Sequence, residues 1–87
     1  MRRTKEEIMM DMLKVATQPV GPTKLMYSTN LSWKPLRQYL EKLTTAGLIE
    51  LISGRREIYE TTEKGKRLLR LSESLLREFE ELKNTSA

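Results

Sequence analysis

The sequence contains neither cysteine nor histidine. Disulfide bonds and thiolate zinc sites are therefore excluded, as are the commonest general base and the commonest metal ligand of proteins. Long apolar stretches are missing too, since the longest runs, such as Ile8-Met9-Met10, have two or three residues. A membrane-spanning helix needs about 20 apolar residues, so we expect neither a signal peptide nor a membrane span, and a cytoplasmic protein.

The chain has 87 residues, enough for one compact domain with a small core. Lys and Arg number 16 against 12 Asp and Glu, which gives a net charge of +4. This excess favours polyanionic partners, but many solvated domains of other function carry a similar excess. Charge alone therefore leaves nucleic-acid binding and an ordinary solvated surface equally open.

Local signals predict three helices in the first half of the chain, over residues 4–17, 23–28 and 33–46. Thr4 and Glu7 form a capping box at the start of the first helix. Pro19 and Pro22 separate it from the second, because proline lacks the amide proton that a helix interior needs. Asn30 tolerates left-handed backbone and predicts the turn that follows.

The third helix has the clearest pattern. Ser32 is its expected N-cap and Gly47 its expected C-cap. Its core stripe is predicted to consist of Leu36, Leu40 and Leu43. The second helix is expected to bury Leu25 together with Met26 or Tyr27.

Two strands and a long helix follow. Residues 48–52 and 57–61 are rich in Leu, Ile, Tyr and Thr, and the Ser-Gly-Arg-Arg between them is typical of a hairpin turn. Thr62 can cap a last helix over residues 63–83. Two short helices joined by a tight turn and followed by a hairpin indicate a winged helix-turn-helix.

The predicted fold class is therefore α+β, mainly α with a small β-hairpin. It comprises a winged helix-turn-helix domain over residues 1–61 and a long C-terminal coiled-coil helix over residues 62–84. The two belong to one compact unit. A disordered tail over residues 85–87 completes the prediction.

Several short segments in a fixed order span most of the chain: Thr23-Lys24-Leu25-Met26-Tyr27, Asn30-Leu31-Ser32, Leu36 with Tyr39-Leu40, Gly47-Leu48-Ile49 and Thr62-Glu63-Lys64-Gly65. In these segments the chain resembles archaeal winged-helix DNA-binding proteins of about ten kilodaltons. Members of that family dimerise through a C-terminal antiparallel coiled coil, so the resemblance implies a homodimer that binds double-stranded DNA. Pro35 departs from the family's pattern and stiffens the first turn of the third helix.

The outward face of the third helix carries the candidate contacts to bases and phosphates, which are Ser32, Trp33, Lys34, Arg37, Gln38 and Glu41. Arg37 and Gln38 have the donors that suit guanine and adenine, whereas Lys34 suits phosphate. Glu41 is expected to accept from a cytosine amino group or to pair with a neighbouring cation. The alternative for this face is simple solvation.

Two further predictions concern the wing and the tryptophan. Arg55 and Arg56 lie at the predicted hairpin tip, where adjacent guanidinium groups suit a minor groove or flanking phosphates, although ordinary solubility also explains them. Trp33 is expected to pack under the second helix as part of the core, or otherwise to wedge against a sugar.

The last helix has an apolar stripe wider than a small domain can cover. Leu68, Leu75 and Leu82 are seven residues apart, which predicts a coiled coil. The full set of predicted dimerisation residues is Leu68, Leu71, Leu75, Leu76, Phe79 and Leu82. The alternative is that this stripe packs back across the first helix of the same chain.

Charge along this helix predicts the direction of pairing. Residues 63–70 contain four basic and one acidic side chain, whereas residues 71–83 contain two basic and four acidic ones. An antiparallel pair sets each basic half beside an acidic half, and a parallel pair does not. We therefore expect an antiparallel homodimer.

Together these patterns predict a homodimer that binds double-stranded DNA without catalysis, cofactor or metal. Its role is that of a transcription regulator or of a nucleoid-associated chromosomal protein. A rival from another class is a protein interaction module of the transcription or replication machinery, in which the third helix never meets DNA. An enzyme is the least favoured class, because no titratable pair has a recognisable catalytic spacing.

Overall fold

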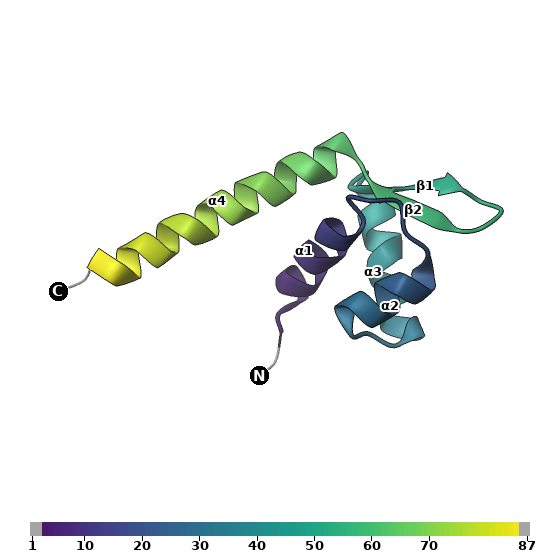
Figure 1. Cartoon of the computed structure of the whole chain (residues 1–87), viewed down its shortest axis with the longest axis horizontal. Coiled ribbons are helices and arrows are strands. Elements are labelled where there is room, and N and C mark those ends of the chain that lie inside the picture. Colours follow the sequence, from purple (N-terminus) through teal and green to yellow (C-terminus); the bar gives the residue numbers. More distant parts are fainter. Residues whose placement is uncertain (1–2, 86–87) are drawn as a thin grey trace.

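The computed structural model describes residues 3–85, which form four helices and one two-stranded sheet. The helices are α1 (Lys5–Val15), α2 (Pro22–Thr29), α3 (Trp33–Thr45) and α4 (Glu63–Thr85), and the strands are β1 (Ile49–Ser53) and β2 (Ile58–Thr61). In Figure 1 the first three helices and the hairpin form one body, from which α4 extends; the extents are 55 × 28 × 19 Å. This order of elements confirms the predicted fold class.

The element bounds differ from the predicted ones by two residues at most. The first helix ends at Val15 rather than at residue 17. The last helix continues to Thr85, two residues beyond its predicted end. Residues 86 and 87 of the predicted tail lie outside the described part of the chain.

Most of the predicted caps are confirmed. The Glu7 amide donates to Thr4 Oγ1 at 3.0 Å and the Thr4 amide donates to Glu7 Oε1 at 3.1 Å, which completes the capping box. Asn30 ends α2 in the left-handed region with φ of 57°, and Gly47 follows α3 with φ of 75°. The Ser32 cap is the exception: this residue holds the N-cap position, but its side chain forms no capping hydrogen bond.

The core lies where three helices meet the hairpin. Its buried side chains are Met12, Leu13, Ala16, Val20, Leu25, Leu36, Leu40, Leu43 and Ile49. The predicted stripe of α3 is therefore confirmed, since all three of its leucines are buried. On α2 the residue buried together with Leu25 is Met26 rather than Tyr27, because Met26 is half-buried whereas Tyr27 is 83% exposed.

The hairpin is joined to this body through its second strand. Ile49 pairs with Thr61 and Leu51 with Tyr59 in the antiparallel register, and the register shifts after Leu51. On the other side of β2, the amides and carbonyls of Val20 and Tyr59 exchange hydrogen bonds of 2.9 and 2.8 Å. The strand β2 is thus held on both sides, which fixes the hairpin relative to the helices.

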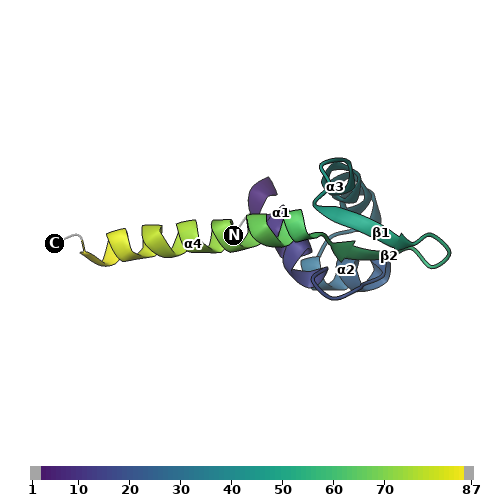
Figure 2. The same ribbon diagram turned by 90° about the horizontal axis from the view of Figure 1, so that it is seen from above.

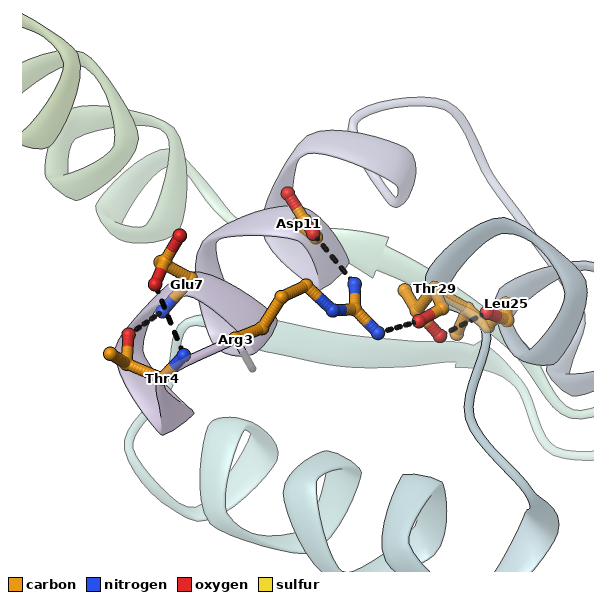
Figure 3. A network of polar contacts seen from close by, with 6 residues as sticks. All are labelled: Arg3, Thr4, Glu7, Asp11, Leu25 and Thr29. Atoms are coloured by element: carbon orange, nitrogen blue, oxygen red, sulfur yellow. Dashed lines mark hydrogen bonds and ion pairs between the residues drawn. The ribbon is translucent and has the colours of Figure 1, made fainter. Parts of the chain in front are cut away.

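Arg3 ties the N-terminal segment to two helices, as Figure 3 shows. Its guanidinium forms an ion pair of 3.0 Å with Asp11 of α1 and donates to the backbone carbonyl of Thr29 at the end of α2. The Thr29 hydroxyl in turn donates to the Leu25 carbonyl. Because a cation near a helix C-terminus satisfies carbonyls that lack an intrahelical partner, Arg3 stabilises the end of α2.

The start of α4 is locked against the end of α3. The Gly65 amide donates to Thr62 Oγ1 at 3.1 Å, which confirms the predicted cap, and the Thr62 hydroxyl donates to the Gly47 carbonyl at 2.6 Å. A Cβ atom on Gly65 would lie 2.2 Å from the carbonyl oxygen of Leu48. This close backbone approach sets the direction in which α4 leaves the body.

Candidate nucleic-acid interface

The exposed face of α3 carries six of the eight predicted DNA contacts. They lie at its N-cap and in its first nine residues, and all six are exposed: Ser32, Trp33, Lys34, Arg37, Gln38 and Glu41. Leu36, Leu40 and Leu43 turn the opposite face of the helix into the core. Helical periodicity therefore directs Lys34 and Gln38 away from the body, where a partner can reach them.

A groove of about 170 Å³ separates α3 from the hairpin. Side chains of α3 spaced three or four residues apart form one wall, and residues of the hairpin form the other. The lining residues are Trp33, Arg37, Leu40, Glu41, Thr44, Glu57 and Tyr59. Within the described chain, no ion pair joins Arg37 to Glu41 or Glu57, and Glu41 has none with Lys42. The charged groups of Arg37, Glu41 and Glu57 are thus available to contact an external partner.

Trp33 lies on the wall of this groove and is 42% exposed. The predicted position under α2 is therefore wrong. The reason is spacing: Trp33 is four residues before Arg37, so it lies with Arg37 at the edge of the exposed face that borders the hairpin. Its indole is an accessible aromatic surface beside the candidate DNA contacts.

Glu57 and Tyr59 are groove residues that the sequence analysis missed. Strand alternation offered a signal for Tyr59, because it shares a side of β2 with the buried Thr61. Partial burial raises the pKa of the Tyr59 phenol, the Glu57 carboxylate raises this pKa further, and the Arg37 guanidinium opposes the rise. The phenol is therefore a neutral hydrogen-bond donor, and it lies within electrostatic reach of both charged side chains.

Arg55 and Arg56 are exposed in the turn between the two strands. Figure 2 shows the hairpin projecting from the body at the end of the molecule opposite the C-terminal end of α4. The structure thus places the two guanidinium groups on an outward projection rather than against the body. Two adjacent cations in this position suit phosphate oxygens or a narrow minor groove.

The predicted dimerisation residues form an exposed apolar stripe on α4. Their exposed fractions run from 42% for Leu68 to 64% for Leu82. The neighbouring Leu69 is only 7% exposed, and Lys14 of α1 forms an ion pair of 3.6 Å with Glu73. The first half of α4 therefore rests on α1 along one side, while the stripe faces outward.

Leu76 differs from the other stripe residues in its surroundings. Together with side chains of α1 it lines a groove whose other members are Thr4, Glu6, Glu7, Met10, Asp11 and Lys14. It is still 54% exposed. Of the predicted set, Leu76 thus comes nearest to the alternative of packing against the first helix.

Another groove, of about 360 Å³, opens where α4 leaves the body. Ala46, Leu48, Leu68 and Leu71 give it an apolar floor, and Lys64 and Arg67 give it a basic rim. The Lys64 ammonium also donates to the Ala46 carbonyl at 2.9 Å, which holds it at the edge. This groove continues the exposed stripe of α4 onto the body.

Across residues 3–85, no three His, Cys, Asp or Glu side chains gather closely enough to hold a metal ion. None of the described helices is long and apolar enough to cross a membrane.

Comparisons with known proteins support an assignment to a family. The family model described as winged helix-turn-helix matches residues 2–84. The uncharacterized protein MJ0290 of Methanocaldococcus jannaschii is 35% identical over 77 residues; the match covers 87% of this chain and 35% of that protein. The crystal structure of Sso10a-2, a DNA-binding protein from Sulfolobus solfataricus, matches with a TM-score of 0.81 and 31% identity, over 94% of this chain and 87% of that one. The resemblance stated for the sequence is thereby confirmed, and the chain belongs to the winged helix-turn-helix family.

Proposed function

We propose that this protein binds double-stranded DNA through α3 and the hairpin, without catalysis. The observation that carries the proposal is the exposed row of Lys34, Arg37 and Gln38 on α3, beside a hairpin that ends in two arginines. A winged helix-turn-helix presents its second motif helix to the major groove and its wing to the adjacent backbone. The structural match to a DNA-binding protein supports the same assignment.

The proposed contacts divide by chemistry. Arg37 and Gln38 read base edges, because their donors match guanine and adenine, and Glu41 accepts from cytosine. Lys34 and Ser32 meet phosphates, for which the unused Ser32 hydroxyl is available. Trp33 packs against a sugar at the edge of the major groove. Arg55 and Arg56 contact the minor groove or flanking phosphates.

We also propose that the protein acts as a homodimer joined through α4. The exposed stripe is the first support, because monomeric proteins rarely expose a long row of large apolar side chains. Charge is the second, because the basic first half of α4 complements the acidic second half of an antiparallel copy. In such a pair the apolar, basic-rimmed groove at the base of α4 faces the partner's acidic end.

The length of α4 relates this dimer to DNA. A helix of 23 residues rises about 1.5 Å per residue, or roughly 34 Å in all. An antiparallel pair therefore separates two winged bodies by about one turn of B-DNA, which is the distance between two major-groove faces on one side of a duplex. We infer that one dimer contacts two half-sites about ten to eleven base pairs apart.

A salt titration tests the proposal. Gel shifts with a random duplex and with a selected duplex, at several salt concentrations, measure the affinity and its salt dependence. If the dimer neutralises about eight phosphates, the logarithm of the affinity falls against the logarithm of salt with a slope of roughly −7. Failure to bind any duplex, or binding that ignores salt, contradicts the proposal and favours the protein interaction module.

The same titration distinguishes the two proposed roles. A transcription regulator binds its selected duplex at least about a thousandfold more tightly than a random one. A nucleoid-associated chromosomal protein binds both alike, because phosphate contacts carry no sequence information. Footprinting on the selected duplex then shows two protected patches if the α4 pair sets the spacing.

A further inference from the structure

Glu57 has a backbone conformation that glutamate rarely adopts. Its φ of 51° lies in the left-handed region, where residues other than glycine, asparagine and aspartate are disfavoured. No hydrogen bond or ion pair of its side chain compensates for this within the described residues. Strained residues of this kind cluster at functional sites. Glu57 is also the last residue of the hairpin turn and directly precedes β2, so any role of its carboxylate depends on where the side chain lies.

The Glu57 side chain lines the groove between α3 and the hairpin. Opposite it on α3 lie Arg37 and Glu41, so that the described lining contains two carboxylates and a single guanidinium. A phosphate group entering this groove to reach Arg37 meets both carboxylates at short range. The edge of a base is uncharged and meets no such repulsion, and its amino groups can donate to a carboxylate.

We propose that Glu57, together with Glu41, keeps phosphate groups out of the groove between α3 and the wing and thereby reserves Arg37 for the edges of bases. This selectivity role rests on the proposed DNA binding. Its physical basis is like-charge repulsion, which is screened less in a half-enclosed groove than on an open surface. The two carboxylates weaken the overall affinity for DNA. In return, Arg37 forms fewer contacts with phosphates, which carry no sequence information.

The test compares two substitutions that change the net charge equally. Glu57→Gln removes the carboxylate from the groove and keeps the size of the side chain. Glu50→Gln is the control. Glu50 is one position along β1 from Leu51, which pairs with the groove residue Tyr59. Because side chains alternate between the two faces of a strand, the Glu50 side chain points to the other face of the hairpin. Circular dichroism checks that both variants keep the wild-type fold.

We expect Glu57→Gln to raise the affinity for a random duplex about five- to tenfold at low salt and Glu50→Gln to raise it less than about twofold. The slope of log affinity against log salt becomes steeper by about one unit per added phosphate contact in the Glu57 variant only. In an Arg37→Ala background the gain from Glu57→Gln falls to that of the control, because no guanidinium remains for the phosphate to reach.

Two results overturn the inference. Equal effects of Glu57→Gln and Glu50→Gln mean that only net charge matters. An undiminished gain in the Arg37→Ala background means that Glu57 does not act through Arg37. Either result, obtained with an unmodified chain that binds DNA, leaves the proposed function intact. An unmodified chain that binds no duplex refutes both proposals.

Discussion

The winged body and the distal half of α4 both carry large apolar side chains, but these are buried in the body and exposed on α4. Met12, Leu25 and Leu36 in the body are fully buried, whereas Leu75, Phe79 and Leu82 on α4 are more than half exposed. Both groups follow helical spacing. Periodicity thus identifies an apolar face but not the surface that covers it, and α4 is long enough to run beyond its own body (Figure 1).

The largest expected effect comes from placing charges on the exposed apolar face of α4. Leu75→Glu with Phe79→Glu places charges in the proposed interface, so the protein becomes monomeric while its winged body stays folded. Affinity for a duplex with two half-sites falls at least about a hundredfold, because the second contact is no longer intramolecular. Sedimentation and gel shifts measure the two effects.

Ser74→Glu is the matched control for this variant. Ser74 is exposed and adjacent to Leu75, but it lies off the heptad positions of the stripe, so the dimer persists. An unmodified chain that sediments as a monomer at micromolar concentration contradicts the dimer.

The second-largest effect is expected at the start of α4, where Gly65 joins this helix to the winged body. Gly65→Ala forces a methyl group toward the Leu48 carbonyl, which lies 2.2 Å from the position of the added Cβ atom. We expect the free energy of unfolding to fall by about 2 kcal/mol, as for overpacking elsewhere in proteins. Gly54→Ala is the control, since no atom lies within 4 Å of its added Cβ. Urea denaturation followed by circular dichroism measures both, and equal stabilities refute the tight joint.

The wing is tested by a smaller change. Arg55→Ala with Arg56→Ala is expected to weaken binding to every duplex about tenfold and to flatten the salt slope by roughly two units per protomer. Gln38→Ala is expected to leave the slope unchanged and to alter the preference among sequences. If the two variants behave alike on all duplexes, the division between phosphate and base contacts is wrong, and the protein coats DNA without reading it.

The smallest effect concerns the pH dependence of the body. Hydrogen bonds from the Thr4 backbone and then from the Thr4 side chain lower the pKa of Glu7 below its ordinary value of 4.5, and Arg3 adds a smaller contribution. A lowered pKa in the folded state means that the stability from this carboxylate is present above pH 4.5 and is lost as the pH falls through the folded value.

Glu7→Gln tests this pH dependence, because glutamine keeps a capping box but does not titrate. The melting temperature of the unmodified chain should fall more steeply below pH 4.5 than that of the variant. Equal slopes show that the Glu7 carboxylate does not contribute to the acid sensitivity.

The order of the elements followed from the sequence because its signals are local. The Thr4 capping box, the left-handed Asn30, the glycine after α3 and the Thr62 cap each act over four residues or fewer, so neighbouring residues decide them. The leucine spacing of α3 likewise determined which of its faces is buried. The family resemblance, carried by the same segments, could also be read from the chain.

Only the tertiary structure decided which surfaces meet. Trp33 faces the hairpin rather than α2, Glu57 closes a groove with Arg37, and Leu76 lies beside α1. Each of these contacts joins elements separated by many residues, and it depends on how β2 pairs with Val20 and how Gly65 directs α4. Local propensity carries no information on such packing angles, because they result from the combined burial of several elements rather than from any one of them.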